Sequence, residues 1–361
     1  MKSLDIEFLS RQAIPIEMGG LLQKLGEHKG RQDLFQHQTP QILETLKANA
    51  IIESTESSNR IEGVTVPLKR FKELMAHPVK PKDRSEAEIL GYRQALSKIH
   101  TNPELFTIDE KTILGLHRQI YTRTDIPAGV WKKRDNTIEE RLSDGRWLTR
   151  FVPVSAVETP GYMKELCVRF NRLWDKRQAS PLILIPAFVF DFLCIHPFSD
   201  GNGRVSRLLT VLLLHQADYT VGRYISIERL IEESKETYYE ALQLSSKGWH
   251  EGKHSLKSWW EYSLGILIGA YQEFERRVGA ITKARGAKTS IIEETINNLP
   301  STFSISDIEH LCPSVSRDMI RVILNRLRKE GHLSCKGTGR GAAWEKRGNN
   351  PLKRGNKRGN N

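Results

Sequence analysis

A polar segment between two apolar runs carries the residues of this chain whose types and spacing suit chemistry. From Ile195 to Arg207 it reads Ile-His-Pro-Phe-Ser-Asp-Gly-Asn-Gly-Arg-Val-Ser-Arg. The run before it, Leu182 to Ile195, is apolar apart from Asp191, and the run after it, Leu208 to Leu214, is apolar again. Such runs are typical of buried helices, so we expect two helices to present the polar segment as a loop.

The residue types in this segment favour the binding of a polyphosphate. We expect a helix that starts near Gly203, with Asn202 as its N-cap. Its first turn holds Arg204 and Arg207, where the helix dipole disfavours cations unless an anion lies over the helix end. Gly201 and Gly203 let the backbone N–H groups approach such an anion closely. The predicted ligand is a di- or triphosphate.

Two further side chains complete the chemistry of the segment. Asp200 beside phosphate needs a cation between them, and Mg²⁺ commonly binds one carboxylate together with phosphate oxygens. His196 has a usual pKa near ~6.5 and can accept a proton at neutral pH. A base, a metal site and an anion hole together predict the transfer of a phosphorus group to a hydroxyl.

His196 to Arg207 also matches, at every specified position, the Fic family signature His-Pro-Phe-x-Asp-Gly-Asn-Gly-Arg-x-x-Arg. The chain thus resembles an adenylyltransferase that moves AMP from ATP to a Ser, Thr or Tyr hydroxyl of a target protein. The resemblance implies a helical bundle with a β-hairpin flap. It also implies a role for each residue: His196 deprotonates the target hydroxyl, Asp200 holds Mg²⁺, Gly201, Asn202 and Gly203 form the anion hole, Arg204 and Arg207 hold the β- and γ-phosphates, and Phe198 anchors the loop.

A second motif lies more than a hundred residues earlier. The helix that opens at Thr39-Pro40 is expected to end at Ser58-Asn59-Arg60-Ile61-Glu62-Gly63, with Gly63 as its C-cap. From composition alone this is a helix end with a solvated glutamate. The segment also matches the Fic inhibitory motif Ser/Thr-x-x-x-Glu-Gly/Asn, in which the glutamate pairs with the last signature arginine, here Arg207. We favour this regulatory interpretation, and the sequence leaves open whether Glu62 acts within one chain or across a homodimer.

Other segments are expected to position the site. Ser85-Glu86-Ala87-Glu88 has the pattern of a capping box and opens a helix to about His100. Val130 to Val154 alternates loosely around Asp144-Gly145, which predicts a β-hairpin similar to the Fic flap. Its edge would register a target peptide by strand addition, and a purely structural hairpin is the alternative.

The C-terminal part predicts a separate small unit after a linker at Ile281 to Lys288. Its elements resemble a winged helix-turn-helix, a module commonly used to bind DNA. Thr289 to Glu345 holds seven Lys or Arg and seven Asp or Glu, so DNA binding and protein interaction both stay open. The expected elements are helices at Ser290–Asn297, Ser304–Leu311 and Ser316–Lys329, and wing strands at Leu333–Lys336 and Ala342–Glu345 around Gly337-Thr338-Gly339-Arg340-Gly341.

The composition of the chain indicates which class of protein it belongs to and where it is located. The net charge is +12, and Lys346 to Asn361 contributes six basic residues and no acid, which predicts a disordered basic tail. The four cysteines fit neither a metal pattern nor a disulfide framework. Reduced thiols, no signal peptide and no apolar run long enough for a bilayer predict a cytoplasmic protein that does not enter the membrane.

The 361 residues suit two to three domains. We expect a mainly α chain with an N-terminal helical region and inhibitory helix over residues 1–84, a Fic catalytic core over 85–278, a winged helix-turn-helix over 289–345 and the basic tail over 346–361. Two alternatives stay open: the same site removing AMP or transferring another phosphoryl or nucleotidyl group, and a DNA-binding regulator whose core senses nucleotide. The intact His196 favours the transferase, because a sensor needs no base.

Overall fold

The computed structural model describes residues 2–38, 40–141, 145–283, 287–312, 315–337 and 342–347. Within these ranges the chain is mainly helical, as predicted, with two small antiparallel sheets. Five parts of the predictions lie outside the described residues: Thr39 at the start of the predicted inhibitory helix, Asp144 in the hairpin turn, residues 284–286 of the predicted linker, residues 338–341 of the predicted wing and residues 348–361 of the predicted tail.

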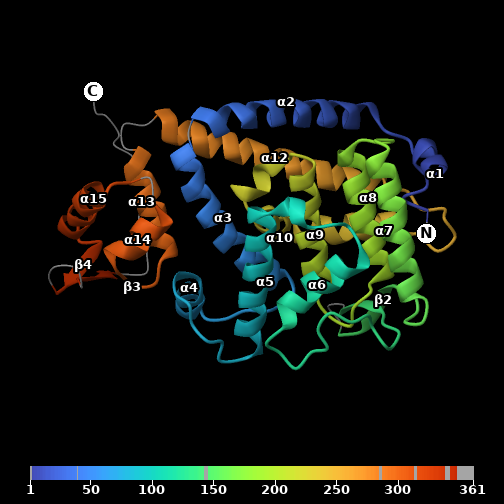
Figure 1. The fold of residues 1–361 in the computed structure, drawn as a ribbon, viewed down its shortest axis with the longest axis horizontal. Helices are drawn as coiled ribbons and strands as arrows, with labels where there is room; N and C mark the ends of the chain where they lie inside the picture. Colours follow the sequence, from blue (N-terminus) through green and yellow to red (C-terminus); the bar gives the residue numbers. More distant parts are fainter. Residues whose placement is uncertain are drawn as a thin grey trace.

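The N-terminal helices lie along one side of the molecule. Helix α1 (Ile6–Arg11) is followed by α2 (Ile16–Gln38), which runs beside the long helix α12 (Lys257–Lys283) in Figure 1. Polar contacts fix this pair, since His28 and Arg31 of α2 both reach the Glu275 carboxylate, each at 2.7 Å. Helix α3 (Pro40–Ile61) then enters the core, and Gly63 follows its end with a φ of +75°, which agrees with the predicted capping role.

A bundle of five helices surrounds the signature segment. These are α5 (Arg84–Thr101), α6 (Glu110–Tyr121), α7 (Thr159–Asp175), α8 (Pro181–Ile195) and α9 (Asn202–Gln216). Helix α8 is buried nearly all round because its run is apolar on every face. Two indoles of α12 bind its backbone: Trp259 donates to the Pro186 carbonyl at 2.8 Å and Trp260 donates to the Ile183 carbonyl at 3.1 Å.

Two predicted helix starts are wrong. Helix α5 is capped by Asp83, whose carboxylate accepts from the Glu86 N–H at 2.9 Å, and the expected capping box at Ser85 and Glu88 does not form. The residue that caps α9 is Gly201, with φ +82°, and Asn202 is already helical. No side chain caps α9, so the N–H groups of its first turn stay available to a ligand.

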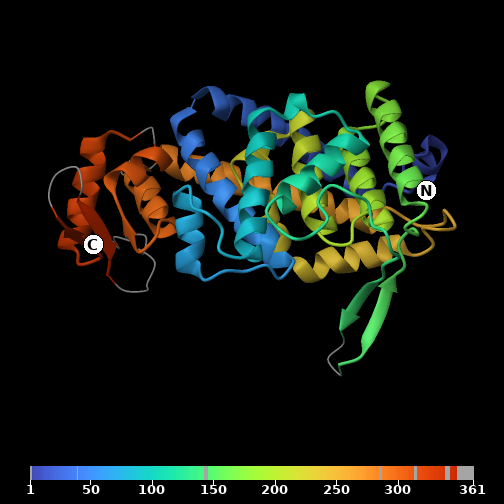
Figure 2. The same ribbon diagram turned by 60° about the horizontal axis from the view of Figure 1, so that its bottom comes forward.

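The predicted hairpin is confirmed. Strand β1 (Ile138–Arg141) pairs antiparallel with β2 (Trp147–Phe151), and Figure 2 shows the ribbon projecting from the helical body. Shorter elements complete this part of the chain: α4 (Leu68–Ala76), η1 (Pro103–Leu105), η2 (Thr220–Arg223), α10 (Ile227–Glu233) and α11 (Lys235–Ser246).

The C-terminal elements have a hydrophobic core of their own. Helices α13 (Ala287–Asn298), α14 (Ile305–Leu311) and α15 (Arg317–Lys329) pack with a sheet of order β3–β5–β4. Strands β4 (Leu333–Lys336) and β5 (Ala343–Lys346) were expected, and β3 (Thr302–Phe303) was not, because two residues carry no usable period.

The predicted linker is mostly wrong, since α12 runs to Lys283 and α13 starts at Ala287, and residues 284–286 lie outside the described residues. The Lys72 ammonium of α4 donates to the Asn297 carbonyl of α13, which ties the C-terminal unit to the bundle. The Lys346 ammonium of β5 donates to the same carbonyl from within the unit.

All four cysteines are free thiols, as expected. In the described part of the chain, no helix combines the length and the apolar character that a bilayer span requires.

Candidate active site

The loop that joins α8 to α9, His196 to Gly201, is held by side chains from other elements; we call it the signature loop. Asn202 fixes it from within, because its side-chain amide accepts from the Phe198 N–H at 2.9 Å and donates to the Phe198 carbonyl at 2.8 Å. Lys132 holds both sides of His196, with its ammonium on the Ile195 carbonyl at 3.2 Å and its backbone N–H on the Pro197 carbonyl at 2.8 Å. The loop geometry is thus fixed before any ligand binds.

His117 of α6 supports the loop from below. Its ring stacks on Phe198 with centroids 3.9 Å apart, and Phe198 is fully buried, as predicted for an anchor. The Gly129 N–H donates to Nδ1 at 2.9 Å, so Nε2 carries the hydrogen that reaches the Asp200 carbonyl at 3.2 Å. Burial lowers the pKa of His117 to about 4, which keeps the ring neutral in this role.

His196 ends α8 in a left-handed conformation, with φ 52° and ψ 59°. A non-glycine residue in that region is strained, and such strain collects at functional sites. Its Nδ1 lies 3.3 Å from the Leu193 carbonyl, which can only accept, so Nδ1 carries the hydrogen and Nε2 keeps its lone pair. Burial, helped by the charge of Lys132, lowers the pKa of His196 to about 4, so the ring is a neutral base at physiological pH.

Arg207 is occupied by the end of α3. Its Nε donates to the Ser58 hydroxyl at 2.8 Å, and its Nη2 donates to the Ser58 carbonyl at 2.9 Å and to the Glu62 carboxylate at 2.8 Å. The Arg207 side chain is 3% exposed and that of Glu62 is 26% exposed. The contact between Glu62 and the last signature arginine is therefore present, and it forms within one chain.

The same carboxylate lies over the N-terminus of α9. A Cβ built on Gly203 would collide with the Oε1 atom of Glu62, so glycine at this position leaves room for that oxygen. Gly201 meets a second constraint, since its φ is +82° and a Cβ there would lie 2.7 Å from the Tyr121 ring. The Glu62 carboxylate thus occupies the place where the sequence predicts an anion.

Both terminal nitrogens of Arg204 donate to protein groups. Its Nη1 donates to Glu88 of α5 and to the Asn59 side chain at 3.4 Å, and its Nη2 donates to the Tyr121 hydroxyl at 2.5 Å. Arg204 and Glu88 are each 1% exposed. Breaking a pair buried to this extent is costly, so Arg204 is held more firmly than Arg207.

Asp200 lies at the mouth of the site with its side chain 42% exposed. One carboxylate oxygen accepts from the Gly201 N–H at 2.6 Å, and the other accepts from Nη2 of Arg84 at 2.8 Å. Asp200 is thus the acidic group of the loop that solvent reaches.

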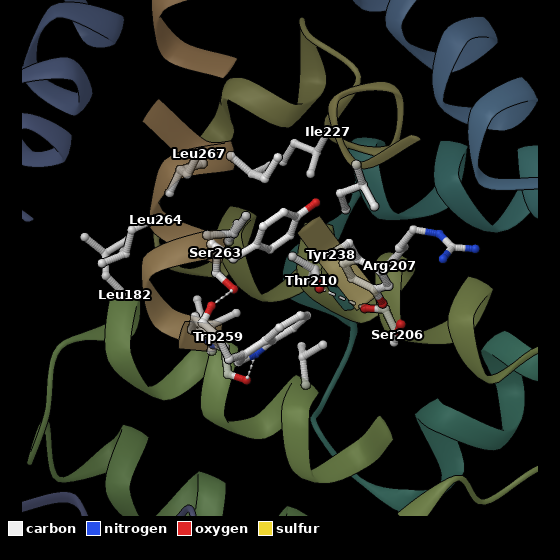
Figure 3. Close-up of a pocket in the computed structure, with 17 residues that line it drawn as sticks. Leu182, Ser206, Arg207, Thr210, Ile227, Tyr238, Trp259, Ser263, Leu264 and Leu267 are labelled. Carbon is white, nitrogen blue, oxygen red and sulfur yellow. Dashed lines mark hydrogen bonds between the residues drawn. The ribbon is translucent and has the colours of Figure 1, made fainter. Parts of the chain in front are cut away.

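An apolar cavity of about 60 Å³ lies behind α9. Figure 3 shows its wall of aliphatic and aromatic side chains, among them Leu264, Trp259 and Tyr238, and the Arg207 guanidinium points away from them. Ser206, Thr210 and Ser263 on its wall donate to carbonyls of their own helices. The cavity offers no cation to a polyphosphate, so the charged site lies on the other side of α9.

Residues 107–214 match the model of the Fic/DOC family. This segment, which includes the whole signature, resembles a Fic domain. The chain is 27% identical over 220 residues to the protein adenylyltransferase Fic of Drosophila persimilis and to that of Drosophila melanogaster. These matches cover 59% of this chain but only 39% and 41% of the two relatives, so the chain spans about two fifths of the length of the curated relatives it matches.

Solved Fic structures share the fold. A Fic family protein from Desulfovibrio desulfuricans G20 aligns with a TM-score of 0.59 at 19% identity, covering 94% of this chain and 98% of that one. Fic-1 from C. elegans aligns with a TM-score of 0.55 at 22% identity, covering 74% of each chain. The expectation of a Fic-type helical bundle is confirmed.

Asp200 of the Fic domain fits the single-carboxylate site expected for Mg²⁺. Mg²⁺ keeps several waters and commonly binds one or two carboxylates together with substrate phosphates. No cluster of three or more His, Cys, Asp or Glu side chains suited to a metal occurs among the residues that the structure describes. A partly exposed lone carboxylate beside an anion site is consistent with a metal that arrives with the nucleotide.

The structure also brings residues to the Fic domain site that the sequence did not single out. Arg84, Glu88, Tyr121 and Lys132 all touch the signature loop or its arginines. They come from α5, α6 and the segment before the hairpin, and no spacing relates them to His196. A buried glutamate cannot be recognised from the sequence without knowing which arginine it meets.

Proposed function

We propose that this protein is an adenylyltransferase that moves AMP from ATP to a Ser, Thr or Tyr hydroxyl of a target protein. The observation that carries the proposal is the neutral His196 with a free Nε2 lone pair beside the uncapped N-terminus of α9. The names of the curated relatives support the same chemistry.

The reaction follows from these groups. Nε2 of His196 takes the proton of the target hydroxyl as its oxygen attacks the α-phosphorus of ATP. The bond from that phosphorus to the oxygen bridging to the β-phosphate breaks, and pyrophosphate leaves with the electron pair. The N–H groups of Asn202 and Gly203, at the positive end of α9, stabilise the charge that develops on the phosphates.

The remaining signature residues bind the polyphosphate. Arg207 takes the γ-phosphate, and Arg204, held by Glu88 and Tyr121, contributes positive charge at the β-phosphate. Asp200 would hold Mg²⁺, which neutralises phosphate oxygens when bound.

We further propose that Glu62 keeps this site inactive. Its carboxylate lies on Arg207 and against Gly203, where the γ-phosphate needs the same donors. ATP therefore binds productively only when Glu62 withdraws. Glu62 is the last residue before Gly63, and its side chain is partly exposed, so a modest movement of the end of α3 suffices.

The hairpin and the C-terminal unit are proposed to handle macromolecular partners. The edge of the projecting ribbon would align the target peptide by strand addition. The C-terminal unit is proposed to be a winged helix-turn-helix, with α15 as its recognition helix. Arg321, Asn325 and Arg328 lie on the exposed face of α15, and these residue types suit the edges of bases in a DNA groove.

Transfer of labelled nucleotide tests the proposal. Wild type, Glu62→Gly and His196→Ala are incubated with ATP labelled at the α- or the γ-phosphate, and protein-bound label is followed. We expect α-label to appear, to rise in Glu62→Gly and to vanish in His196→Ala. Transfer of γ-label alone would point to a phosphotransferase, and release of AMP from a modified protein would indicate the reverse reaction. No transfer by any variant would favour a nucleotide-sensing regulator.

A further inference from the structure

Four charged side chains at the mouth of the site form a closed ring of alternating sign. Arg84 reaches Glu88 at 2.5 Å and Asp200 at 2.8 Å. Arg204 contacts the same Glu88 and lies 3.6 Å from Asp200. Each carboxylate therefore lies between two guanidinium groups, and each guanidinium lies between two carboxylates.

The two halves of this ring differ in burial. Glu88 and Arg204 are each 1% exposed, whereas Arg84 is 57% exposed and Asp200 is 42% exposed. A buried pair resists the loss of either partner, but an exposed pair is weak and exchanges readily with solvent ions. Arg84 is also the first residue of α5, where the helix dipole disfavours a cation. Arg84 is thus the member of the ring that can leave.

We propose that Arg84 is a stand-in cation for Asp200. In the nucleotide-free protein it neutralises the carboxylate and holds it at the mouth of the loop. Its guanidinium takes the Oδ2 atom, while Oδ1 accepts from the Gly201 N–H, so a divalent cation arriving with nucleotide competes with Arg84 for this carboxylate. This inference rests on the proposed function only in assigning the metal to Asp200.

In both states each of these charged groups has a partner of opposite sign. Without nucleotide, Arg84 offsets Asp200 and Glu62 offsets Arg207. With metal and nucleotide, the metal replaces Arg84 and the phosphates replace Glu62. The two contacts oppose different components of the same substrate, since the Arg84 contact competes with the metal and the Glu62 contact competes with the phosphates.

Metal titration tests this assignment in the full chain. In a Glu62→Gly background saturated with ADP, Mn²⁺ binding is measured by electron paramagnetic resonance. Because an exposed pair competes only weakly, Arg84→Ala should bind Mn²⁺ about 2- to 5-fold more tightly, and Arg84→Lys should stay near the parent. Arg169→Ala is the control, since it breaks a 2.5 Å pair on α7 with Glu165, which is 42% exposed like Asp200, and it should not change Mn²⁺ affinity.

A measurement without metal or nucleotide completes the test. Arg84→Ala should lower the melting temperature of the nucleotide-free protein by more than it does in an Asp200→Asn background, since the carboxylate it neutralises is then absent. If Arg84→Ala binds Mn²⁺ with unchanged or weaker affinity while the parent binds normally, the inference about Arg84 is wrong and the metal role of Asp200 is not affected. Absence of nucleotide-dependent Mn²⁺ binding in the parent would instead remove the metal role of Asp200, and the inference with it.

Discussion

Removing the carboxylate of Glu62 is the perturbation with the largest predicted effect. Glu62 accepts a 2.8 Å hydrogen bond from Arg207, whose side chain is 3% exposed. A hydrogen bond to a charged group contributes about 1.5–3 kcal/mol. In the proposed assignment ATP must break this contact before its γ-phosphate reaches Arg207, so Glu62→Gly should raise the apparent affinity for ATP by roughly 10- to 150-fold.

Without nucleotide, the Glu62→Gly variant should be less stable than the wild type. Arg207 keeps its two bonds to Ser58 in the variant but loses the countercharge, so the melting temperature should fall by a few degrees. Saturating ATP should restore it, because the phosphates supply the missing negative charge. Glu62→Gln, which keeps an acceptor but removes the charge, should give an intermediate result.

Isothermal titration with ATP, thermal melts and transfer of α-label together check this reasoning. Glu56→Gln is the matched control, because Glu56 lies on the same helix and pairs with Arg60 at 2.9 Å but does not touch Arg207. If Glu62→Gly lowers the melting temperature while ATP affinity and α-label transfer stay at wild-type values, the carboxylate is structural and the inhibitory assignment is wrong.

Four further predictions follow from the loop. Because burial depresses the pKa of His196 to about 4, transfer of α-label should stay level from about pH 8 to about pH 5.5 and fall only as the pH approaches that pKa; an acid limb near ~6.5 would refute the buried-base assignment. Because the pKa of His196 is lower in the folded chain than in the unfolded chain, the contribution of this residue to stability is complete above the unfolded pKa of ~6.5 and declines below it. Thermal melts measured across this pH range can follow the decline. Asn202→Ala leaves the Phe198 N–H unpaired, at a cost of about 1–3 kcal/mol, and should lower both melting temperature and transfer; unaltered transfer would show that the loop does not need this clamp. Gly201→Ala should be less stable than wild type because of the φ of +82° and the nearby Tyr121 ring. Gly115→Ala, in open space on α6, should instead gain roughly 0.5–1 kcal/mol of stability. Equal denaturation midpoints for the two variants would contradict the steric argument.

Two helix starts were predicted wrongly because each offered more than one acceptable local cap. Ser85 and Asp83 are both residue types that can cap α5. Asp83 is the cap because Glu88, the other half of the expected capping box, binds Arg204 instead. Asn202 would suit an N-cap, but its amide satisfies both polar backbone groups of buried Phe198. In both cases a long-range demand decided between acceptable local options.

The sequence by itself determined the signature loop, the end of α3 and the hairpin. Each of these features depends on residues that are close together in the sequence. Gly63, for example, adopts a positive φ at the end of its helix, and apolar runs lie on either side of the segment that begins at His196. The tertiary structure decided which partners these groups meet. Only the packing of α5 and α6 against α9 selects Glu88 and Tyr121 for Arg204 and places Arg84 on Asp200, because charges far apart in sequence pair according to where helices pack.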